Sequence, residues 1–525
     1  MTGSARGDRR QNTTSYSHPQ EAHLLDLHYA MQYDASGRPI VRTVNSSQTN
    51  ASGNSAFGEV ISVPITPVIQ LDALYDLDPR EFETFTFGTG TIESTGTLFK
   101  THTGTGAYGY SVIRSRRVIR YRPGQGALTR FTAAFDNPQA GVTLRAGYFN
   151  QENAIQIGYN GTQFGVLRAT GGKAEIATIT ITSNTAGTAT ITLAGVATNV
   201  TLSTTDTTTS ATEIAAASFS GWIAEQCDNT VTFLATSLGA KAGAYTVGGT
   251  ATGTASVVQT GVAQTENWTY QSSFNVDKLD GTGPSGVTID TTKLNVFQIN
   301  FRWLGAGEIR YAVEDSETGD MIFFHHEHFS NRNVDVHTDN PSFKIGYVAY
   351  NTTGSTITDS HCFGASMMAA IEGITVETAF PDGTSSDSKG PLSSNTNQHL
   401  MSIRNRTTHR SKLNLRLVVL KTLTVAFQGS DPAFVYLYLN PTFSTTHSFA
   451  KVGDYSSVTK SITGGTFTLA DEQPLAVFAL PINGSETFNL DNLHLVLPPS
   501  SILSVAIQSG QNISESIVAL TWAEF

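Results

Sequence analysis

Charged side chains are scarce in this chain of 525 residues. Only 14% of its residues are Asp, Glu, Lys or Arg, whereas soluble domains average about a quarter. Ser, Thr, Asn and 47 glycines fill the shortfall, and these residues suit strand faces and turns better than helix interiors. With 28 Phe and 17 Tyr the chain can still build packed cores, so the composition excludes a disordered protein and favours an all-β one.

Cysteines, apolar runs and an export signal are lacking as well. Cys227 and Cys362 lie far apart in the sequence, which excludes a disulfide framework and a Cys-based zinc site. No N-terminal apolar run has the roughly 7–15 residues of a signal peptide, and no stretch approaches the ~20 apolar residues of a membrane span. We therefore expect a protein made in a cytoplasm without an export signal and without a membrane span.

Positive charge is in deficit, since the net charge is −11. This argues against nucleic acid as the main partner, because phosphate binding needs a positive surface. One cluster of basic residues stands out in this acidic chain. We expect it at a strand edge, where charge discourages pairing between sheets. Its alternative partners are anionic sugars or an acidic neighbouring subunit. It comprises Arg114, Arg116, Arg117, Arg120 and Arg122.

Recognisable catalytic motifs are missing too. The chain has no G-x-S-x-G, no H-E-x-x-H, no Walker loop and no Rossmann fingerprint opening a helix. A glycosidase needs two carboxylates about 5–10 Å apart. Four carboxylates near a predicted hairpin could supply such a pair, but charged residues on an exposed hairpin are also expected simply for solubility. They are Glu308, Glu314, Asp315 and Glu317. We expect no enzymatic activity and no cofactor.

What the sequence does contain is alternation of apolar and polar residues. Phe297, Ile299, Phe301 and Trp303 fall on one strand face, and after a Gly-containing turn the apolar side continues with Ile309, Tyr311 and Val313. Asn160-Gly161 between two alternating runs predicts a tight hairpin. The predicted fold is all-β, with several antiparallel β-sandwiches of lectin-like or jelly-roll type.

Changes in amino-acid composition along the sequence divide the chain into segments. We expect an N-terminal arm at 1–60, a central lectin-like jelly-roll sandwich from 61–173 plus 264–372, a polar linker at 373–390 and a C-terminal sandwich at 391–525. Residues 174–263 are dominated by Thr, Ala and Gly and are nearly uncharged, which indicates a small α+β domain inserted into a loop of the central sandwich.

Two local expectations accompany this division. In the insert, Ser210 with Glu213 three residues later predicts the start of a short helix. In the last module, Leu413, Leu415, Leu417 and Val419 are expected on the buried face of one strand.

The stretch "IFFHHEHF" (322–329) holds three of the chain's 13 histidines. In a strand His326 and His328 share one face, whereas His325 and Glu327 share the other. Two ligands from one strand fall short of the three that zinc needs, although His337 could be the third, or copies could meet on a threefold axis. The alternative, a solvent-facing strand edge carrying imidazoles, is the interpretation we favour, so no metal is expected.

Several segments resemble structural proteins of tailed bacteriophages and large algal DNA viruses. "YDASGRPIV" (33–41), "YRPGQGALTRFTAAF" (121–135), "IGYNGTQFGVLRATGG" (157–172) and the 279–309 segment are similar to that group. The resemblance implies attachment of the arm to the particle through the turn of Tyr33, Asp34, Gly37 and Arg38. Ser36 and Pro39 depart from the usual pattern, which puts the docking surface of the arm in question.

The resemblance implies a virion structural protein, localised in the virion as an external fibre, spike, vertex or tail appendage. Its expected partners are its own copies, as a homotrimer, other virion proteins through the arm, and host surface glycans. Two alternatives stay open: a minor capsid or decoration protein without a receptor role, and a carbohydrate-binding module. A glycan-cleaving enzyme is the third and weakest.

Overall fold

The computed structural model describes residues 64–525 apart from 374–378, 380, 444–446, 464, 466–472 and 494, together with two short strands of the N-terminal segment. These two, β1 (Gln32–Tyr33) and β2 (Pro39–Ile40), pair with each other. Asp34, Gly37 and Arg38 of the expected docking turn lie outside the described residues. The helices of the described part are too short to cross a membrane.

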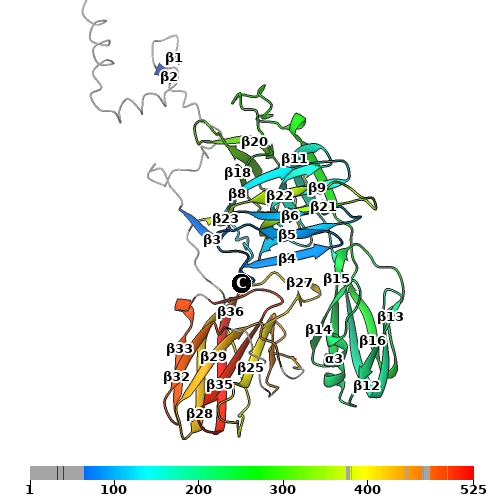
Figure 1. Ribbon diagram of the computed structural model, residues 1–525, viewed down its shortest axis with the longest axis vertical. Coiled ribbons are helices and arrows are strands. Elements are labelled where there is room, and N and C mark those ends of the chain that lie inside the picture. The colour runs from blue at the N-terminus through cyan, green and yellow to red at the C-terminus, as the bar shows by residue number, and fades with distance from the viewer. Residues whose placement is uncertain are drawn as a thin grey trace, which may run out of the picture. The chain divides into compact units, whose positions relative to one another are not determined.

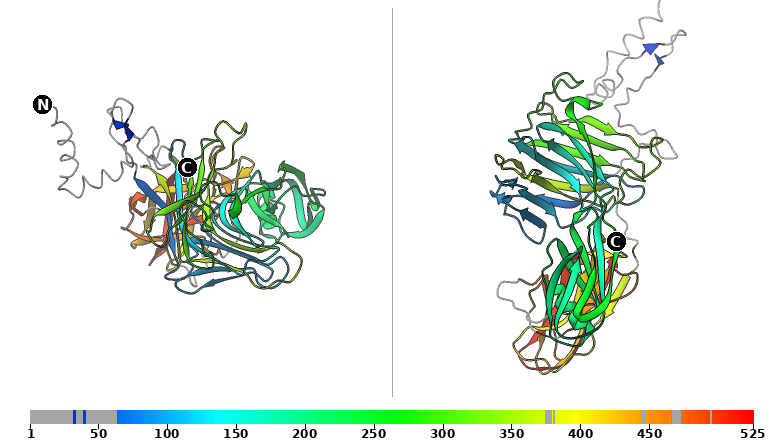
Figure 2. Two further views of the ribbon diagram at one scale, coloured as in Figure 1. Left: turned by 90° about the horizontal axis from the view of Figure 1, so that it is seen from above. Right: turned by 90° about the vertical axis from the view of Figure 1, so that its right-hand side faces the viewer.

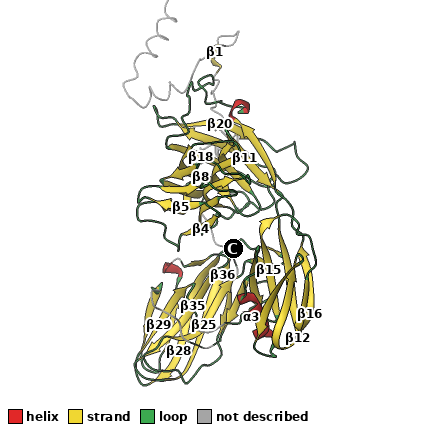
Figure 3. Ribbon diagram, turned by 45° about the vertical axis from the view of Figure 1, so that its right-hand side comes forward, coloured by secondary structure: helices red, strands yellow, loops and turns green. Residues whose placement is uncertain are grey.

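Strands make up most of the described chain, and all of their pairings are antiparallel (Figure 3). Besides the single α-helix of the described residues, only the 3-10 turns η1 (Gln271–Ser273) and η2 (Asp491–Leu493) are helical. The predicted all-β class with several antiparallel sandwiches is therefore confirmed.

Two sheets form the central sandwich (Figure 1). The first has seven strands in the order β17 (Thr265–Tyr270), β11 (Gln163–Thr170), β10 (Ala154–Asn160), β9 (Val142–Phe149), β21 (Lys344–Asn351), β7 (Tyr110–Ser115) and β4 (Phe82–Phe87). Gly161 occupies the turn of the β10–β11 hairpin at φ +65, in the left-handed region that tight hairpin turns require.

The second sheet has nine strands. Its order is β20 (Met321–Glu327), β19 (Ile309–Glu314), β18 (Asn295–Phe301), β8 (Ala127–Asp136), β22 (His361–Gly364), β6 (Phe99–His102) and β5 (Thr91–Ser94); β23 (Ser366–Glu372) pairs with both β8 and β3 (Ile65–Asp72). Strands from before and after residue 200 thus alternate within one sandwich, as the mixed colours in Figure 2 show.

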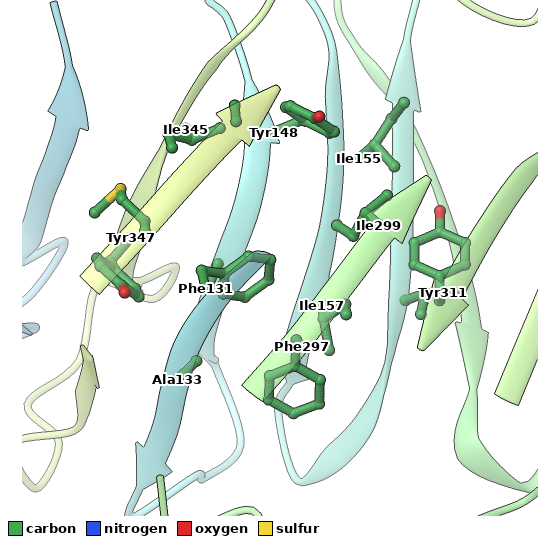
Figure 4. Packing of buried hydrophobic residues seen from close by; sticks show 14 of the residues in the cluster. Phe131, Ala133, Tyr148, Ile155, Ile157, Phe297, Ile299, Tyr311, Ile345 and Tyr347 are labelled. Carbon is green, nitrogen blue, oxygen red and sulfur yellow. The ribbon is translucent and has the colours of Figure 1, made fainter. Parts of the chain in front are cut away.

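The core of this sandwich lies between the two sheets. Phe297, Ile299 and Phe301 are at most 1% exposed and meet Tyr148 and Ile157 of the opposite sheet (Figure 4). The alternation in the sequence predicted this face, because inward positions recur every second residue.

Of the five arginines in the basic cluster, only Arg114 lies in a strand, and that strand is not at a sheet edge. Arg114 belongs to β7, which pairs with β21 on one side and β4 on the other. For Arg114 the edge interpretation was wrong, because alternation alone gives no strand order; the other four arginines follow the end of β7. The side chain of Arg114 instead forms an ion pair with Glu83 on the neighbouring strand.

A separate sheet occupies the connection between β11 and β17. Its strands are β13 (Val196–Leu202), β12 (Ala174–Leu193), β15 (Thr230–Leu238) and β14 (Trp222–Cys227), with β16 (Thr246–Gln259) also paired to β12. Lys173 and Val262 bond to each other where the segment leaves and rejoins the central sheet.

Helix α3 (Thr207–Ala216) covers part of this insert and begins earlier than predicted. Its N-cap is Asp206, whose carboxylate accepts from Thr209 N at 2.7 Å. Ser210 is instead buried inside the helix and accepts from Asn184. Glu213 accepts from Ser203 N, which lies ten residues earlier and before the N-cap, so the predicted capping box between Ser210 and Glu213 does not form.

The C-terminal sandwich also has two sheets. One contains β24 (Pro381–Ser385), β36 (Ile513–Glu524), β28 (Val418–Gly429), β33 (Ser485–Asn489) and β34 (Val496–Leu497); the other contains β30 (Ala450–Lys451), β31 (Val458–Ser461), β25 (Gln398–Asn405), β35 (Ile502–Ser509), β29 (Ala433–Leu439) and β32 (Ala476–Leu480). The strands β26 (Thr408–His409) and β27 (Lys412–Leu413) form a small hairpin.

Two expectations for this region were wrong. Part of the expected 373–390 linker is strand, because β24 pairs with β36 as a mostly exposed edge whose polar residues resemble a linker. The buried residues near the start of β28 are Val418 and Leu420, whereas Leu415 and Leu417 are only partly buried. A strand that begins one residue out of register buries the opposite set of side chains.

Candidate functional site

The outer face of the seven-stranded sheet carries aromatic and polar side chains. Alternate residues of each strand point away from the core, so this face is formed by a set that the core does not use. Across the sheet from β4 to β17 the set includes Phe85, Phe87, Tyr110, Tyr350, Arg145, Gln156, Trp268 and Tyr270. Phe85 and Phe87 are 57% and 64% exposed.

A groove of about 460 Å³ lies on this face. We call it the outer groove. Its floor is formed by strands β4, β7, β21, β9 and β10, and part of its wall by the insert. The lining comprises Phe85, Tyr110, Val112, Arg114, Arg145, Phe149, Asn150, Gln151, Ala154, Gln156, Gln264, Val348 and Tyr350, with Ile223, Thr236, Ser237 and Leu238 of the insert.

Besides Phe85 and Phe87, this face carries two pairs of neighbouring aromatic rings. Tyr110 and Tyr350 are directly opposite each other on β7 and β21, with ring centroids 5.4 Å apart at 86°. Trp268 and Tyr270 on the edge strand β17 are nearly parallel, at 7° and 6.3 Å. Flat apolar rings with polar tips are the surfaces on which sugar rings stack.

Two buried donors in the outer groove lack a hydrogen-bond partner among the described residues. They are Nε of Arg145 and Nε2 of Gln156. Gln156 faces Gly147 across the β9–β10 ladder, and Arg145 lies two residues before Gly147, so the two side chains are diagonal neighbours. An unmet buried donor costs about 1–3 kcal/mol, and a ligand with acceptor oxygens would remove that cost.

The charged groups of this face are paired. Glu83 contacts Lys344 at 2.7 Å and Arg114 at 2.8 Å. Burial raises the pKa of Glu83, but the two cations outweigh that effect and hold the pKa below its ordinary value. Burial lowers the pKa of Lys344 to about 8. Glu266 contacts Arg145 Nη1 at 3.1 Å, whereas Nε of the same guanidinium is buried and has no partner among the described residues.

The histidines of "IFFHHEHF" divide as alternation predicts. His326 and His328 both approach Oε1 of Glu308, at 3.5 and 3.6 Å. Their rings lie 5.8 Å apart beside an open pocket of about 460 Å³ at the end of β20. Arg310 also contacts Glu308, at 2.7 Å.

The opposite strand face carries the other two side chains. Glu327 accepts from Tyr311 Oη and from Arg168. His325 is buried against Tyr311 and Phe274, because a bulge in β20 turns it toward the core. Burial lowers the pKa of His325 to about 4.

His337 does not join His326 and His328. It is buried, stacks on Phe329 at 4.3 Å and has Nδ1 2.9 Å from the Thr338 hydroxyl. Burial lowers the pKa of His337 to about 4. The third member of the cluster is Glu308, which the sequence pointed to only as a hairpin carboxylate, and Arg310 occupies one side of that carboxylate as a competing cation.

Sequence reasoning missed the outer groove. The available signal was polar residues at outward positions of strands whose inward positions are all apolar, such as Arg145 in "VTLRAGYF" and Gln156 in "AIQIGYN". Such residues are usually solvated, and only the strand order shows that these two lie in the middle of a sheet beside an inserted domain.

No family model matches the chain, and no curated protein sequence does either. Solved structures that resemble it include a lectin from Bauhinia forficata in complex with GalNAc, at 8% identity and a TM-score of 0.23 over 59% of this chain and 98% of that one. Arcelin-5, a lectin-like defense protein from Phaseolus vulgaris, gives 9% and 0.23 over 60% and 99%. The botulinum neurotoxin serotype C1 binding domain gives 6% and 0.25 over 86% and 98%. At such TM-scores these likenesses carry no statement about what this chain binds.

Proposed function

We propose that this chain is a binding protein that holds an oligosaccharide in the outer groove. The observation that carries the proposal is the pair of unmet donors, Arg145 Nε and Gln156 Nε2, buried beside the rings of Tyr110 and Tyr350. Sugar hydroxyls and ring oxygens accept from such donors, and the apolar faces of the sugar rings stack on the aromatics.

Binding without turnover fits the charges of the groove. A glycosidase keeps one carboxyl protonated by raising its pKa. Among the described residues, no Asp or Glu lines the outer groove. Glu83 lies beside it, paired with the lining residue Arg114, and Lys344 and Arg114 hold its pKa below the ordinary value, so this carboxylate suits the anchoring of cations rather than proton donation.

We further propose that the binding surface belongs to a virion structural protein, an external appendage attached through its N-terminal arm and assembled as a homotrimer. The support is the sequence resemblance to phage and algal-virus structural proteins and the multi-sandwich architecture. A minor capsid or decoration protein without a receptor role is the second candidate, favoured if the outer groove binds no glycan.

A glycan array probed with the full chain tests the binding proposal. We expect selective capture of a limited set of oligosaccharides, with capture weakened in Gln156→Leu and retained in Gln428→Ala, an exposed glutamine of the C-terminal sandwich. An array without a bound glycan would overturn it. Mass spectrometry of purified virus particles tests the virion proposal, and particles that lack the chain would overturn that part alone.

A further inference from the structure

Two histidines face each other on neighbouring strands of the nine-stranded sheet, whereas the outer groove lies on the seven-stranded sheet. His102 ends β6, and His361 begins β22; the two residues are directly opposite each other in the antiparallel register. Their ring centroids are 4.3 Å apart at 61°. Both side chains are partly shielded, with 15% and 26% of their surface exposed.

Carboxylates surround this pair on every ring nitrogen. Asp359 Oδ2 lies 3.0 Å from His102 Nδ1 and 3.0 Å from His361 Nε2. On the remaining nitrogens, Glu93 Oε2 lies 3.4 Å from His102 Nε2, and Asp136 Oδ2 lies 3.2 Å from His361 Nδ1. Four ring nitrogens therefore face four carboxylate contacts.

Neutral imidazoles do not satisfy that arrangement. Each neutral ring carries one N–H, so two of the four nitrogens would turn a lone pair toward a carboxylate oxygen. Full protonation would supply the missing donors, but it would place two imidazolium ions at a ring distance of 4.3 Å. A metal cation between His102, Asp359 and His361 removes both repulsions, because it accepts lone pairs from nitrogen and oxygen alike.

Hydrogen bonds from the protein itself hold the Asp359 carboxylate in place. Its second oxygen, Oδ1, accepts from Gly104 N at 2.7 Å and from the Thr103 hydroxyl at 3.3 Å. Burial raises the pKa of Asp359, but its hydrogen bonds with His102 and His361 hold the pKa below the ordinary value, so it is an anion at neutral pH. Outer contacts of this kind orient metal ligands.

The spacing of the ligand atoms also suits an ion. One atom from each of His102, Asp359 and His361 lies within 4.8 Å of the others. In a tetrahedral zinc site with bonds of about 2.0 Å, ligand atoms are roughly 3.3 Å apart. The two distances of 3.0 Å to Asp359 are close to that value, so small side-chain adjustments suffice.

We propose that His102, Asp359 and His361 bind a divalent transition-metal ion of the zinc type through His102 Nδ1, Asp359 Oδ2 and His361 Nε2, with solvent as the fourth ligand. Glu93 and Asp136 then accept from the remaining ring N–H groups and orient the two imidazoles. Two imidazoles among carboxylates favour zinc, cobalt or nickel over calcium and magnesium, which take oxygen ligands. The bound ion would join β5, β6, β8 and β22 at one end of the sheet, and its role is to stabilise the sandwich.

The second histidine cluster provides a matched control. Glu308, His326 and His328 also bring three possible ligands together. In that cluster, however, Arg310 contacts the carboxylate at 2.7 Å, and the positive charge opposes a metal cation. His328→Gln therefore removes a comparable imidazole without touching the proposed site.

The test is zinc titration of the full chain after dialysis against a chelator, followed by calorimetry and elemental analysis. We expect one zinc per chain in the wild type and in His328→Gln, and at least ten-fold weaker binding in His361→Gln and His102→Gln. Zinc should raise the melting temperature of the wild type and not of these two variants. A wild type that binds no zinc at micromolar concentration, or a loss confined to His328→Gln, would overturn the proposal.

A measurement on the wild type alone guards against variants that fail to fold. Cobalt(II) in a tetrahedral site with nitrogen and oxygen ligands gives an intense visible absorption, whereas hydrated cobalt absorbs weakly. We expect this absorption to saturate at one equivalent and to disappear when a chelator removes the ion. The weak absorption of the hydrated ion at all ratios would contradict the site.

Discussion

Arg145 and Gln156 are diagonal neighbours on strands β9 and β10; both line the outer groove, and each has a buried N–H with no hydrogen-bond partner among the described residues. Removing one such donor by an apolar residue of similar size relieves its burial cost in the free protein. It also removes a hydrogen bond from the proposed complex. Such a substitution should therefore maintain or raise the stability of the free protein and lower its affinity for the glycan, so the two effects can be measured separately.

Gln156→Leu is therefore expected to leave the protein at least as stable as the wild type while weakening oligosaccharide binding. A neutral hydrogen bond contributes about 0.5–1.5 kcal/mol, which corresponds to roughly a two- to ten-fold loss of affinity. Calorimetric titration with the best glycan of the array measures the loss. Unchanged affinity would show that the groove is not where the sugar lies.

Phe85→Ala tests the aromatic part of the same groove. The ring is 57% exposed, so its removal should change the free energy of unfolding by less than about 0.5 kcal/mol. A stacked aromatic contributes about 0.5–1.5 kcal/mol beyond its area, so a several-fold weaker glycan complex is expected. Phe434→Ala, 48% exposed on β29 of the C-terminal sandwich, is the matched control and should bind like the wild type.

Phe297→Ala is expected to destabilise the central sandwich by about 3–5 kcal/mol, because it opens a cavity in a close-packed core. Phe297 is fully buried and contacts Phe131, Phe135 and Phe164. Urea denaturation followed by a probe in this sandwich measures the loss. A change below about 1 kcal/mol would mean that the two sheets do not pack as described.

Acid should destabilise the fold through its buried histidines. Burial lowers the pKa of His337 and His447 to about 4 and that of His399 to about 3. Between pH 4 and the unfolded value near 6.5 the unfolded chain binds protons that the native chain does not. Stability is therefore complete above about pH 6.5 and falls as the pH decreases, by up to about 3 kcal/mol for each fully buried histidine.

His337→Gln checks that sign. The variant carries no titratable ring, so its unfolding free energy should fall less steeply between pH 6.5 and 4 than that of the wild type. The comparison concerns the slope, because the substitution also removes the stacking on Phe329. An unchanged slope, or stability that rises on acidification, would contradict the proposed burial of His337.

Local sequence patterns predicted much of the fold and little of the candidate site. Phe297 and Ile299 were predictably inward because alternation is a local property. Asp206 was missed as the N-cap because Ser210 offered a competing local signal. The start of β28 was misjudged by one residue, which reversed the buried face, and Gly-Pro-rich polar residues concealed the edge strand β24.

The sites depend on strand order, which alternation does not contain. His102 and Asp359 are 257 residues apart, and only the pairing of β6 with β22 brings them together. In the same way, Arg145 and Gln156 resemble solvated polar residues until β21 and β11 are placed on either side of them. The pairing of β19 with β20 brings Glu308 close to His326, and no local sequence signal predicts that contact.

The insert leaves and returns through adjacent strands, β11 and β17, with Lys173 and Val262 bonded to each other at its base. A segment attached in this way can change in length and composition while β11 and β17 keep their register, because surface connections tolerate insertions. Since four residues of the insert also line the outer groove, a different insert would reshape the proposed binding surface and leave the sheet beneath it unchanged.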